Sequence, residues 1–567
     1  MKGVYVFVGP VMDRKSRRLR AIDLYSGVGG WSLGLRLANI EVVASYEKWG
    51  PANETNFKNN FHQAQTVDIR RLALADLPDD IDIVVGSPPC TQFSYSNRGG
   101  GGDIADGLVD VKRFLTIVDH LKPRVWAMEN VPRVAKIIEA ELKEGGALEE
   151  FNHLRCVTHI IDMADYGLPQ RRRRCIAGNF DINLLESYKA NAQPRLLGDV
   201  ISSLKNDPVV DPIFGITIPR SELIDHIEED ALNPEEVRIN RSNKMTHTVY
   251  NAMAFPDRLD RTVRTITATC TRVSRESIVI AADSEQEVYR RLTLRERASL
   301  QGFPITFQFY GANYGQKLKM IGNAVPPAFS YLMGHVLQNH PADLVEPLAE
   351  VGKTLVRPVP APVETPPDRA GARYPTTRTF RFAIPSLQLK SGVRFELRND
   401  HSGGDVKWEV AFYFGTSKEI LSLILDRSLA RRLTSAMSTE LTEAVTAPLD
   451  DLTAFMSTVD IQNLQSVWSH HGPGGTRPFT LLDRLSDVGM SLTAAMTDHE
   501  AEAQRLIVSM LEHEYRDGLA HIPGVSKLQR NAALILAGFL IASSVNPVLA
   551  ARAADRRKGK ASDTSAR

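Results

Sequence analysis

A cysteine and a glutamate each follow a short apolar run, and the pair predicts covalent catalysis. Gly86-Ser87-Pro88-Pro89-Cys90 follows the run 81–85, and Glu129 follows the run 125–128. In an open parallel sheet, residues just past the carboxyl ends of strands line the ligand crevice, so Cys90 and Glu129 are expected to face one cleft. A thiol beside an acid can act as a nucleophile with acid assistance. Free cysteines are often simply buried, but the two prolines and the polar residues that follow argue against this here.

A glycine-rich turn precedes both segments and predicts a ligand site. Asp23 ends an apolar run, and Gly27, Gly29 and Gly30 follow it. Glycines let the backbone approach a ligand, and the helix that starts here favours an anion at its N-terminus. Glu47 ends the next strand, where an acid can bind ribose hydroxyls. NAD, FAD and S-adenosylmethionine all fit this pattern, and so does a purely structural glycine turn.

A run of arginines, Gln170-Arg171-Arg172-Arg173-Arg174, leads directly into a strand-like segment. Alternate side chains of a strand face opposite sides, so Arg172 and Arg174 are expected to share one face. That face would bind phosphate or support the cleft. The alternative is a solvated charge run, which is the usual fate of such a sequence.

The elements that must position these side chains alternate between strand and helix. The apolar patterns predict strands at 19–25, 42–46, 157–161 and 175–177, and helices at 31–38 and 111–121. This alternation is typical of an α/β fold with a parallel sheet. Periodicity fades between about 180 and 260, which indicates a small insert with a specialised surface. Order returns at 264–267 and 278–280, and 318–337 is expected to form a strand, a turn and a helix.

The composition is that of a soluble globular chain with more than one domain. Its 567 residues, 43% hydrophobic and 24% charged, predict two or three domains. The net charge is +1, so any binding of a polyanion must come from local patches. The four cysteines show no CxxC spacing, which argues against a zinc site or disulfides and favours a reducing cytoplasm. A cytoplasmic protein without a bound metal is therefore expected.

The second part of the chain predicts a separate domain. The proline-rich stretch 356–375 is expected to be a stiff, extended linker. Residues 376–550 begin with strand-like segments at 380–384 and 408–414 and then become mostly helical, so a mixed α+β domain is expected. The apolar run 532–545 is too short for a membrane span and is expected to be a buried helix. The basic, polar tail 551–567 is expected to be disordered.

Taken in order, the motifs resemble those of the DNA (cytosine-5) methyltransferases. The glycine turn matches the first cofactor motif, with Tyr25 where phenylalanine is usual. The later matches are the nucleophile loop Ser87-Pro88-Pro89-Cys90 with Phe93-Ser94, the acid motif Glu129-Asn130-Val131, the QxRxR residues Gln170, Arg172 and Arg174, the segment Arg264-Thr265-Ile266-Thr267-Ala268, and the last motif Gly322-Asn323-Ala324-Val325. The family usually has glutamine directly after the nucleophile, whereas here Thr91 intervenes before Gln92.

The resemblance implies a Rossmann-like methyltransferase that uses S-adenosylmethionine. It places the catalytic core at 18–180, a small target-recognition insert at 181–262, and the rest of the methyltransferase domain at 263–345. The residues that it assigns to the cofactor are Asp23, Tyr25, Gly27, Gly29, Gly30, Glu47, Asp68, Ile69, Pro88, Asn323 and Val325.

The resemblance also implies a mechanism on duplex DNA. Cys90 would add to C6 of a flipped cytosine, and Glu129 would hold N3. Arg172 and Arg174 would support the charge on the ring and favour the Cys90 thiolate. The residues expected to contact the substrate are Gln170, Thr265, Arg272 and Arg275, with Arg264 as a further candidate for phosphate contact.

Other functions stay open on the sequence alone. A cytosine-5 methyltransferase acting on tRNA shares these motifs, but the long insert favours DNA. A nicotinamide oxidoreductase would explain the glycine turn but not Cys90 with Glu129, and an inactive DNA-binding regulator would need neither. The domain at 376–550 could dock a cognate restriction or defence protein, mediate oligomerisation or add DNA contacts. The resemblance favours a bacterial or phage enzyme of restriction-modification or phage defence, working with the nucleoid and not at a membrane.

Overall fold

The chain folds into two compact units. The computed structural model describes residues 17–93, 103–245, 253–283, 287–368, 379–389, 392–401, 406–415, 420–461, 464–465, 475–515, 522 and 524–564. Unit 1 comprises Met1–Leu232 and Ala254–Asp368, and unit 2 comprises Asn233–Met253 and Arg369–Arg567. The expected insert, 181–262, is therefore divided, because its segment Asn233–Met253 belongs to unit 2.

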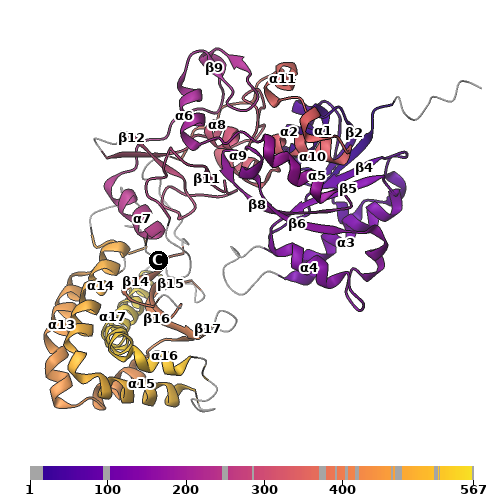
Figure 1. The fold of residues 1–567 in the computed structure, drawn as a ribbon. Coiled ribbons are helices and arrows are strands. Elements are labelled where there is room, and N and C mark those ends of the chain that lie inside the picture. The colour runs from indigo at the N-terminus through magenta and orange to yellow at the C-terminus, as the bar shows by residue number, and fades with distance from the viewer. Residues whose placement is uncertain are drawn as a thin grey trace, which may run out of the picture. The chain divides into compact units, whose positions relative to one another are not determined.

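Unit 1 is built on a seven-stranded sheet of order β3-β2-β1-β4-β5-β8-β6 (Figure 1). The strands are β1 Arg20–Leu24, β2 Glu41–Glu47, β3 Gln63–Thr66, β4 Ile83–Gly86, β5 Val125–Asn130, β6 Val157–Asp162 and β8 Arg173–Gly178. Strands β3 to β5 pair in parallel, whereas β8 is antiparallel to both β5 and β6. The expected α/β class is confirmed, and each strand expected between 19 and 177 is present.

Helices cover both faces of this sheet. They include α1 Gly30–Leu37, α2 Gly50–Asn60, α3 Ile104–Leu121, α4 Arg133–Glu141 and α10 Pro327–Leu337. Successive strand residues point to opposite faces. Ala21 and Ile83 accordingly join one core with residues of α1 and α10, and Ile22 and Val84 join another with residues of α3 and α4. The carboxyl ends of β1, β4 and β5 are thus fixed from both sides.

The segment 314–337 corrects one expectation. Residues expected to begin with a strand form α9, Tyr314–Asn323, and only the helix that follows, α10, was predicted correctly. Asn313 caps α9 by accepting a hydrogen bond from Gln316 N. The buried residues Leu318 and Ile321 lie three apart, which is the spacing of one helical face and not that of a strand.

The insert and the segment after it form small elements. Those of unit 1 are α5 Ile182–Ser187, α6 Leu197–Lys205, β9 Val209–Val210, β10 Thr217–Ile218, β11 Val263–Arg264, β12 Val279–Asp283, β13 Val288–Arg291 and α8 Leu294–Leu300. Strand β11 pairs in parallel with β7, Gln170–Arg171, and β12 pairs with β13.

The expected linker is bound along unit 1 between Arg357 and Asp368, a segment here called the strap; its continuation 369–375 lies outside the described residues. Tyr310 donates a hydrogen bond to Pro360 O at 2.7 Å, and Lys317 Nζ donates to Val363 O at 2.8 Å. Asp225 N donates to Glu364 at 2.8 Å. These contacts join the strap to the insert and to α9, so it is a packed part of unit 1 and not a free spacer.

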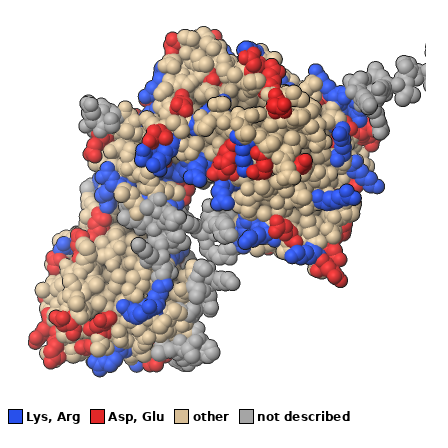
Figure 2. Space-filling model, in the orientation of Figure 1, with Lys and Arg blue, Asp and Glu red and all other residues tan. Residues whose placement is uncertain are grey.

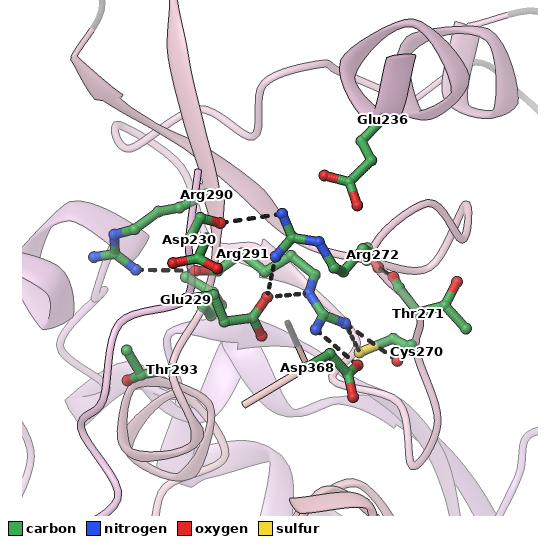
Figure 3. A network of polar contacts seen from close by, with 12 residues as sticks. Glu229, Asp230, Glu236, Cys270, Thr271, Arg272, Arg290, Arg291, Thr293 and Asp368 are labelled. Carbon is green, nitrogen blue, oxygen red and sulfur yellow. Dashed lines mark hydrogen bonds and ion pairs between the residues drawn. The ribbon is translucent and has the colours of Figure 1, made fainter. Parts of the chain in front are cut away.

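A buried ionic cluster holds the end of the strap (Figure 3). Arg291 of β13 donates to Glu229 at 2.6 Å and to Asp368 at 2.9 Å. Glu229 also accepts from Arg272 at 3.2 Å and from Tyr314 at 2.7 Å. Buried charges are tolerated when they are paired and hydrogen-bonded in this way.

Unit 2 combines an antiparallel sheet with helices, as expected. The sheet has the order β14-β15-β16-β17, with β14 Arg381–Gln388, β15 Arg394–Asp400, β16 Lys407–Gly415 and β17 Ile420–Leu423. The helices are α12 Arg427–Ser435, α13 Thr439–Thr458, α14 Pro478–Ala495, α15 Glu500–Glu514, α16 Val525–Arg530 and α17 Ala532–Thr564, together with α7 Pro234–Met245. Arg238 of α7 pairs with Asp483 of α14 at 2.7 Å, which explains why the segment 233–253 belongs to this unit.

Helix α17 is the core helix of unit 2. Its stretch Ala532–Ala550 is long and apolar enough to cross a membrane by length and composition, but most of it is buried within the protein. Ile535, Phe539 and Ile541 are fully buried, as the expectation of a core helix requires. The helix continues to Thr564, through most of the tail for which disorder was expected. The alanines of this tail favour helix, and they extend a helix that packing has already nucleated.

Basic and acidic side chains are interspersed over the face of the molecule drawn in Figure 2. This distribution agrees with the net charge of +1.

Candidate active site

The candidate site lies at the carboxyl ends of β1, β4 and β5. Strand β1 has β2 on one side and β4 on the other, so the order of the strands reverses there. Ligands of open α/β sheets bind outside the carboxyl ends of strands at such a reversal. The glycine turn follows β1, the turn with Cys90 follows β4, and Glu129 is the next-to-last residue of β5.

The turn that carries Cys90 is held from several directions. Ser87 N donates to Leu24 O at 3.1 Å, and Trp31 Nε1 donates to Ser87 Oγ at 3.1 Å. Asn130 Nδ2 donates to Pro88 O at 3.1 Å. The next residue of β5 after Glu129 therefore positions the nucleophile turn. We did not assign this role from the sequence, although the place of Asn130 beside the acid was a signal for it.

Glu129, Arg172 and Arg174 lie together around Cys90. Strand β8 runs antiparallel to β5, which brings Arg174 Nε to 2.8 Å from Glu129 Oε1. Arg172 is fully buried, and its Nη2 donates to Gly322 O at 3.3 Å and to Ala324 O at 3.1 Å. Arg172 lies between β7 and β8, so the expected strand alternation does not extend through it, and its contacts join the site to the segment between α9 and α10.

Three polar atoms of this site lack a hydrogen-bond partner among the described residues. They are Glu129 Oε1, which is ion-paired but not hydrogen-bonded to Arg174, and Nε and Nη1 of Arg172. Buried polar atoms in native proteins are nearly always bonded, so unsatisfied ones point to a ligand. The two guanidinium donors of Arg172 therefore lack a partner among the described residues, whereas Glu129 Oε1 has Arg174 as its ion-pair partner.

The electrostatic state of Cys90 differs from the expected one. Burial, followed by the charge of Glu129, raises the pKa of the Cys90 thiol above its ordinary value, although Arg174 and Arg172 act in the opposite direction. The thiol is therefore protonated at neutral pH, whereas a thiolate was expected. Burial and the neighbouring Arg174 lower the pKa of Arg172 to about 9, so the two arginines also repel each other.

The glycine turn is shaped by close packing. Gly29 has a φ of +85°, and a Cβ on Gly30 would lie 1.9 Å from Val325 O. Gly27 has a φ of +52° and open space where a Cβ would be, and its N–H donates to Glu47 Oε2 at 3.1 Å. Gly27 thus lies at the open side of the turn, and Gly30 lies where the turn touches the segment before α10.

Asp23 supports this turn from beneath. It is fully buried, and its Oδ2 accepts hydrogen bonds from Ser32 N at 3.2 Å and from Ser32 Oγ at 2.7 Å. Burial raises the pKa of Asp23 to about 7. Asp23 therefore fixes the start of α1 and is not exposed to a ligand.

The other candidate cofactor residues surround the same crevice. Glu47 accepts from Gly27 N and, at 2.8 Å, from Trp49 N, and Tyr25 donates to Asp110 at 3.1 Å. The remaining ones differ in exposure: Asp68 is half-buried, Ile69, Pro88 and Val325 are buried, and Asn323 is exposed. Among them, Glu47, Tyr25, Asp68 and Asn323 present polar groups that a ligand can reach.

The expected substrate contacts are corrected by their burial. Gln170 is fully buried and bonds Gln301 at 2.7 Å and Ile266 N at 2.7 Å, so it joins β7 to the segment after β11. Arg272 belongs to the ionic cluster around Glu229, and Arg275 is also buried. Neither guanidinium is presented to a phosphate in this structure.

Two further candidates for substrate contact, Arg264 and Thr265, are half-buried. Thr265 is exposed enough to meet a substrate, although its Oγ1 donates to Arg171 O at 2.8 Å. Arg264 pairs with Asp257, and burial lowers its pKa. Ser94, which extends the expected nucleophile motif, lies outside the described residues.

Comparison with known proteins supports the same assignment. A model of the family described as C-5 cytosine-specific DNA methylase matches residues 19–339. The Type II methyltransferase M.FnuDI of Fusobacterium nucleatum is 26% identical over 56% of this chain and 93% of its own length. M.HindV of Haemophilus influenzae, also a Type II methyltransferase, is 28% identical over 59% of this chain and all of its own length.

A similar solved structure is that of the S. pombe Dnmt2 methyltransferase, which is 20% identical over 57% of this chain and 99% of its own, with a TM-score of 0.40. The family match covers more than half of the chain and includes Cys90, Glu129, Arg172 and Arg174. The chain belongs to the C-5 cytosine-specific DNA methylase family and is a DNA (cytosine-5)-methyltransferase.

Proposed function

We propose that this enzyme transfers a methyl group from S-adenosylmethionine to C5 of a flipped cytosine in a specific duplex sequence, through a covalent bond between Cys90 and C6 of the base. The observation that carries the proposal is the buried ion pair of Glu129 and Arg174 near the Cys90 thiol, next to two buried N–H groups of Arg172 that have no partner among the described residues. A base in this cleft would supply the missing partner. Glu129 is buried and Cys90 is half-buried, so a base paired within a duplex cannot reach them without leaving the stack.

The crevice suits the cofactor. Its residues offer an open backbone at Gly27, the N-terminus of α1, the carboxylate of Glu47, and Asp68 with Ile69. An acid at the end of β2 can bind ribose hydroxyls. S-adenosylmethionine, when bound, supplies the methyl group as an electrophile. Asn323 and Val325 would close the crevice from the α10 side, since Gly30 touches the backbone of Val325.

The residues of the chain account for activation of the base. The Cys90 sulfur forms a bond to C6, and the electron pair of the C5–C6 double bond becomes available at C5. Glu129 holds a proton at N3, which stabilises the charge that develops on the ring. A protonated Glu129 no longer opposes the thiolate, so engagement of the base lowers the barrier to thiol ionisation. The electron pair at C5 would take the methyl group that S-adenosylmethionine supplies, and S-adenosylhomocysteine would leave with the electrons of the broken carbon–sulfur bond. Loss of the C5 proton to solvent would then restore the C5–C6 double bond and expel the Cys90 sulfur.

We also propose a role in restriction-modification or phage defence, within the cytoplasm and on DNA. The similar proteins M.FnuDI and M.HindV are Type II methyltransferases, which supports this context. The alternative of a tRNA substrate is not favoured, because the matching family model is that of DNA methylases. The C-terminal part of unit 2, Arg369–Arg567, lies beyond the matched residues 19–339. We propose that unit 2 is a docking module for a cognate protein or for DNA.

Bisulfite sequencing of plasmid DNA from a methylation-free host tests the proposed function. Cells expressing the wild type should show protected cytosines in one fixed sequence context, and cells expressing Cys90→Ser should show none. Cys156→Ser is the matched control, because Cys156 is a half-buried free cysteine outside the cleft. Soluble wild type that leaves plasmid DNA unmethylated but methylates tRNA would refute the DNA substrate.

A further inference from the structure

A continuous set of polar contacts connects the glycine turn with the nucleophile turn across the start of α3. It consists of Tyr25, Arg70, Gln92, Asp106 and Asp110, here called the α3 cluster. Four segments contribute to it: the turn after β1, the segment after Asp68, the turn after β4, and the first two turns of α3. None of these five side chains takes part in the chemistry proposed above.

The cofactor side of the cluster is closely bonded. Tyr25 OH donates to Asp110 Oδ1 at 3.1 Å. Arg70 Nε donates to Asp110 Oδ1 at 2.9 Å, and Arg70 Nη2 donates to Asp110 Oδ2 at 2.7 Å. This bidentate pairing fixes direction as well as distance. Asp110 is buried, and Tyr25 has a φ of +53°, an unusual backbone state that the surrounding contacts must hold.

The nucleophile side continues from the same arginine. Arg70 Nη1 donates to Asp106 Oδ1 at 2.9 Å, and Gln92 Nε2 donates to Asp106 Oδ2 at 3.1 Å. Gln92 Oε1 accepts from Asp103 N at 3.0 Å. Phe93 N donates to Cys90 O at 3.0 Å, and the fully buried Phe93 ring lies against Gly107 of α3. The backbone of Cys90 is therefore tied to the part of α3 that also holds Tyr25.

We propose that the α3 cluster couples occupation of the cofactor crevice to the placement of Cys90. Its members are positioning residues, and this inference rests on the proposed cofactor site. A ligand that contacts Tyr25 or the segment Asp68–Ile69 changes the position of Asp110 or Arg70. Arg70 binds Asp106 with the same guanidinium, so the change is passed to Gln92 and the nucleophile turn.

The two ends of the cluster each depend on one polar side-chain group. The hydroxyl of Tyr25 makes the contact to Asp110, and the amide of Gln92, two residues after Cys90, makes the contact to Asp106. Removal of either group therefore opens the chain of contacts at one end.

Site-resolved alkylation of Cys90 tests the coupling in the full-length protein. The rate with iodoacetamide is measured by peptide mass spectrometry, with and without S-adenosylhomocysteine, and the affinity for that ligand is measured by calorimetry. Tyr25→Phe removes one hydroxyl, and Gln92→Met replaces the amide side chain by an apolar one of similar size. Asp119→Asn is the control: Asp119 lies on the same helix, about 13 Å beyond Asp110, and pairs with His153 at 2.7 Å.

The ligand should change the alkylation rate of Cys90 in the wild type and in Asp119→Asn by about fivefold or more. In Tyr25→Phe and in Gln92→Met the change should fall below about twofold, and the double variant should add little to either, because the residues form one chain. Ligand effects that stay at the wild-type level in both single variants would overturn the coupling, as would a wild type that binds the ligand without any effect on Cys90. A wild type that does not bind S-adenosylhomocysteine would instead refute the proposed cofactor, and the inference with it.

Discussion

Gly30→Ala tests how the glycine turn and the segment before α10 are joined. The added Cβ would lie 1.9 Å from Val325 O and 3.0 Å from the Val325 carbonyl carbon. Backbone lies on both sides of this contact, so α1 and the turn at Val325 must separate by about 1 Å, and overpacking of this kind costs about 1–3 kcal/mol. The predicted loss is confined to unit 1, and S-adenosylhomocysteine should bind more weakly.

The matched control is Gly50→Ala, at the first residue of α2. A Cβ on Gly50 meets nothing within 4 Å, so this variant should be neutral or more stable by about 0.4–1 kcal/mol. Hydrogen exchange followed by peptide mass spectrometry measures both variants. A loss of about 1–3 kcal/mol corresponds to roughly 5- to 150-fold faster exchange of the β1 and β4 amides, if they exchange by global opening of the unit. The β15 and β16 amides of unit 2 should not change.

Equal protection of β1 in Gly30→Ala and Gly50→Ala, with unchanged ligand affinity, would mean that Gly30 does not touch Val325 and that the last motif does not complete the crevice. Loss of protection in unit 2 as well would contradict the separation of the two units.

Three further predictions follow from buried charges. Glu129→Gln should lower the pKa of Cys90, because a negatively charged neighbour is removed. Alkylation of Cys90 at neutral pH should then become faster, while the rate of methylation falls by about a hundredfold or more. Slower alkylation would contradict this. Lys317→Met should destabilise unit 1 by about 3–5 kcal/mol, as measured by hydrogen exchange, because it leaves the buried carboxylate of Asp225, 2.6 Å away, without its partner. The double variant Lys317→Met with Asp225→Asn should recover most of the lost stability. Asp23 has a pKa of about 7 in the folded state, so its contribution to the free energy of unfolding is present below about pH 4 and is lost as the pH rises to about 7. Urea unfolding of Asp23→Asn should therefore show a flatter pH dependence over this range than the wild type. An unchanged pH dependence would contradict the raised pKa of Asp23.

The sequence predicts the parts of the site that depend on local pattern. Cys90 and Glu129 each end a short apolar run, and parallel strands carry both residues to the same edge of the sheet. Strand alternation also led to the prediction that Arg172 and Arg174 share one face, although Arg172 lies between β7 and β8. The strands before Cys90 and Glu129 are confirmed because each rests on a few neighbouring residues, whereas the roles of the four side chains stay predictions.

The parts that depend on distant partners could not be read in the same way. Arg272 could equally be a phosphate contact or a buried ion-pair partner, and the choice is made by Glu229, over forty residues earlier in the chain. The protonation of Cys90 depends on whether burial or two arginines prevail, and burial prevails. The helix α9 was expected as a strand, because a short apolar segment does not distinguish the two states.

The strap is a further feature that composition did not reveal. Its prolines are typical of a linker, yet Glu364 and Asp368 are bound by Asp225 and Arg291 of unit 1. These partners lie in the insert and in β13, so the sequence offers no local signal for them. A protein shortened before Asp368 would lose contacts of unit 1 and not only a connection.

The most direct test of the account is the search for the Cys90 adduct itself. The wild type is incubated with S-adenosylmethionine and a duplex that carries 5-fluorocytosine at the mapped methylation site, where fluorine replaces the proton that must leave C5. A covalent mechanism predicts a complex that survives denaturation, with the modified base attached to the Cys90 peptide and no complex for Cys90→Ser. An enzyme that methylates the unmodified duplex but forms no adduct, or forms it at another residue, would rule out Cys90 as the nucleophile.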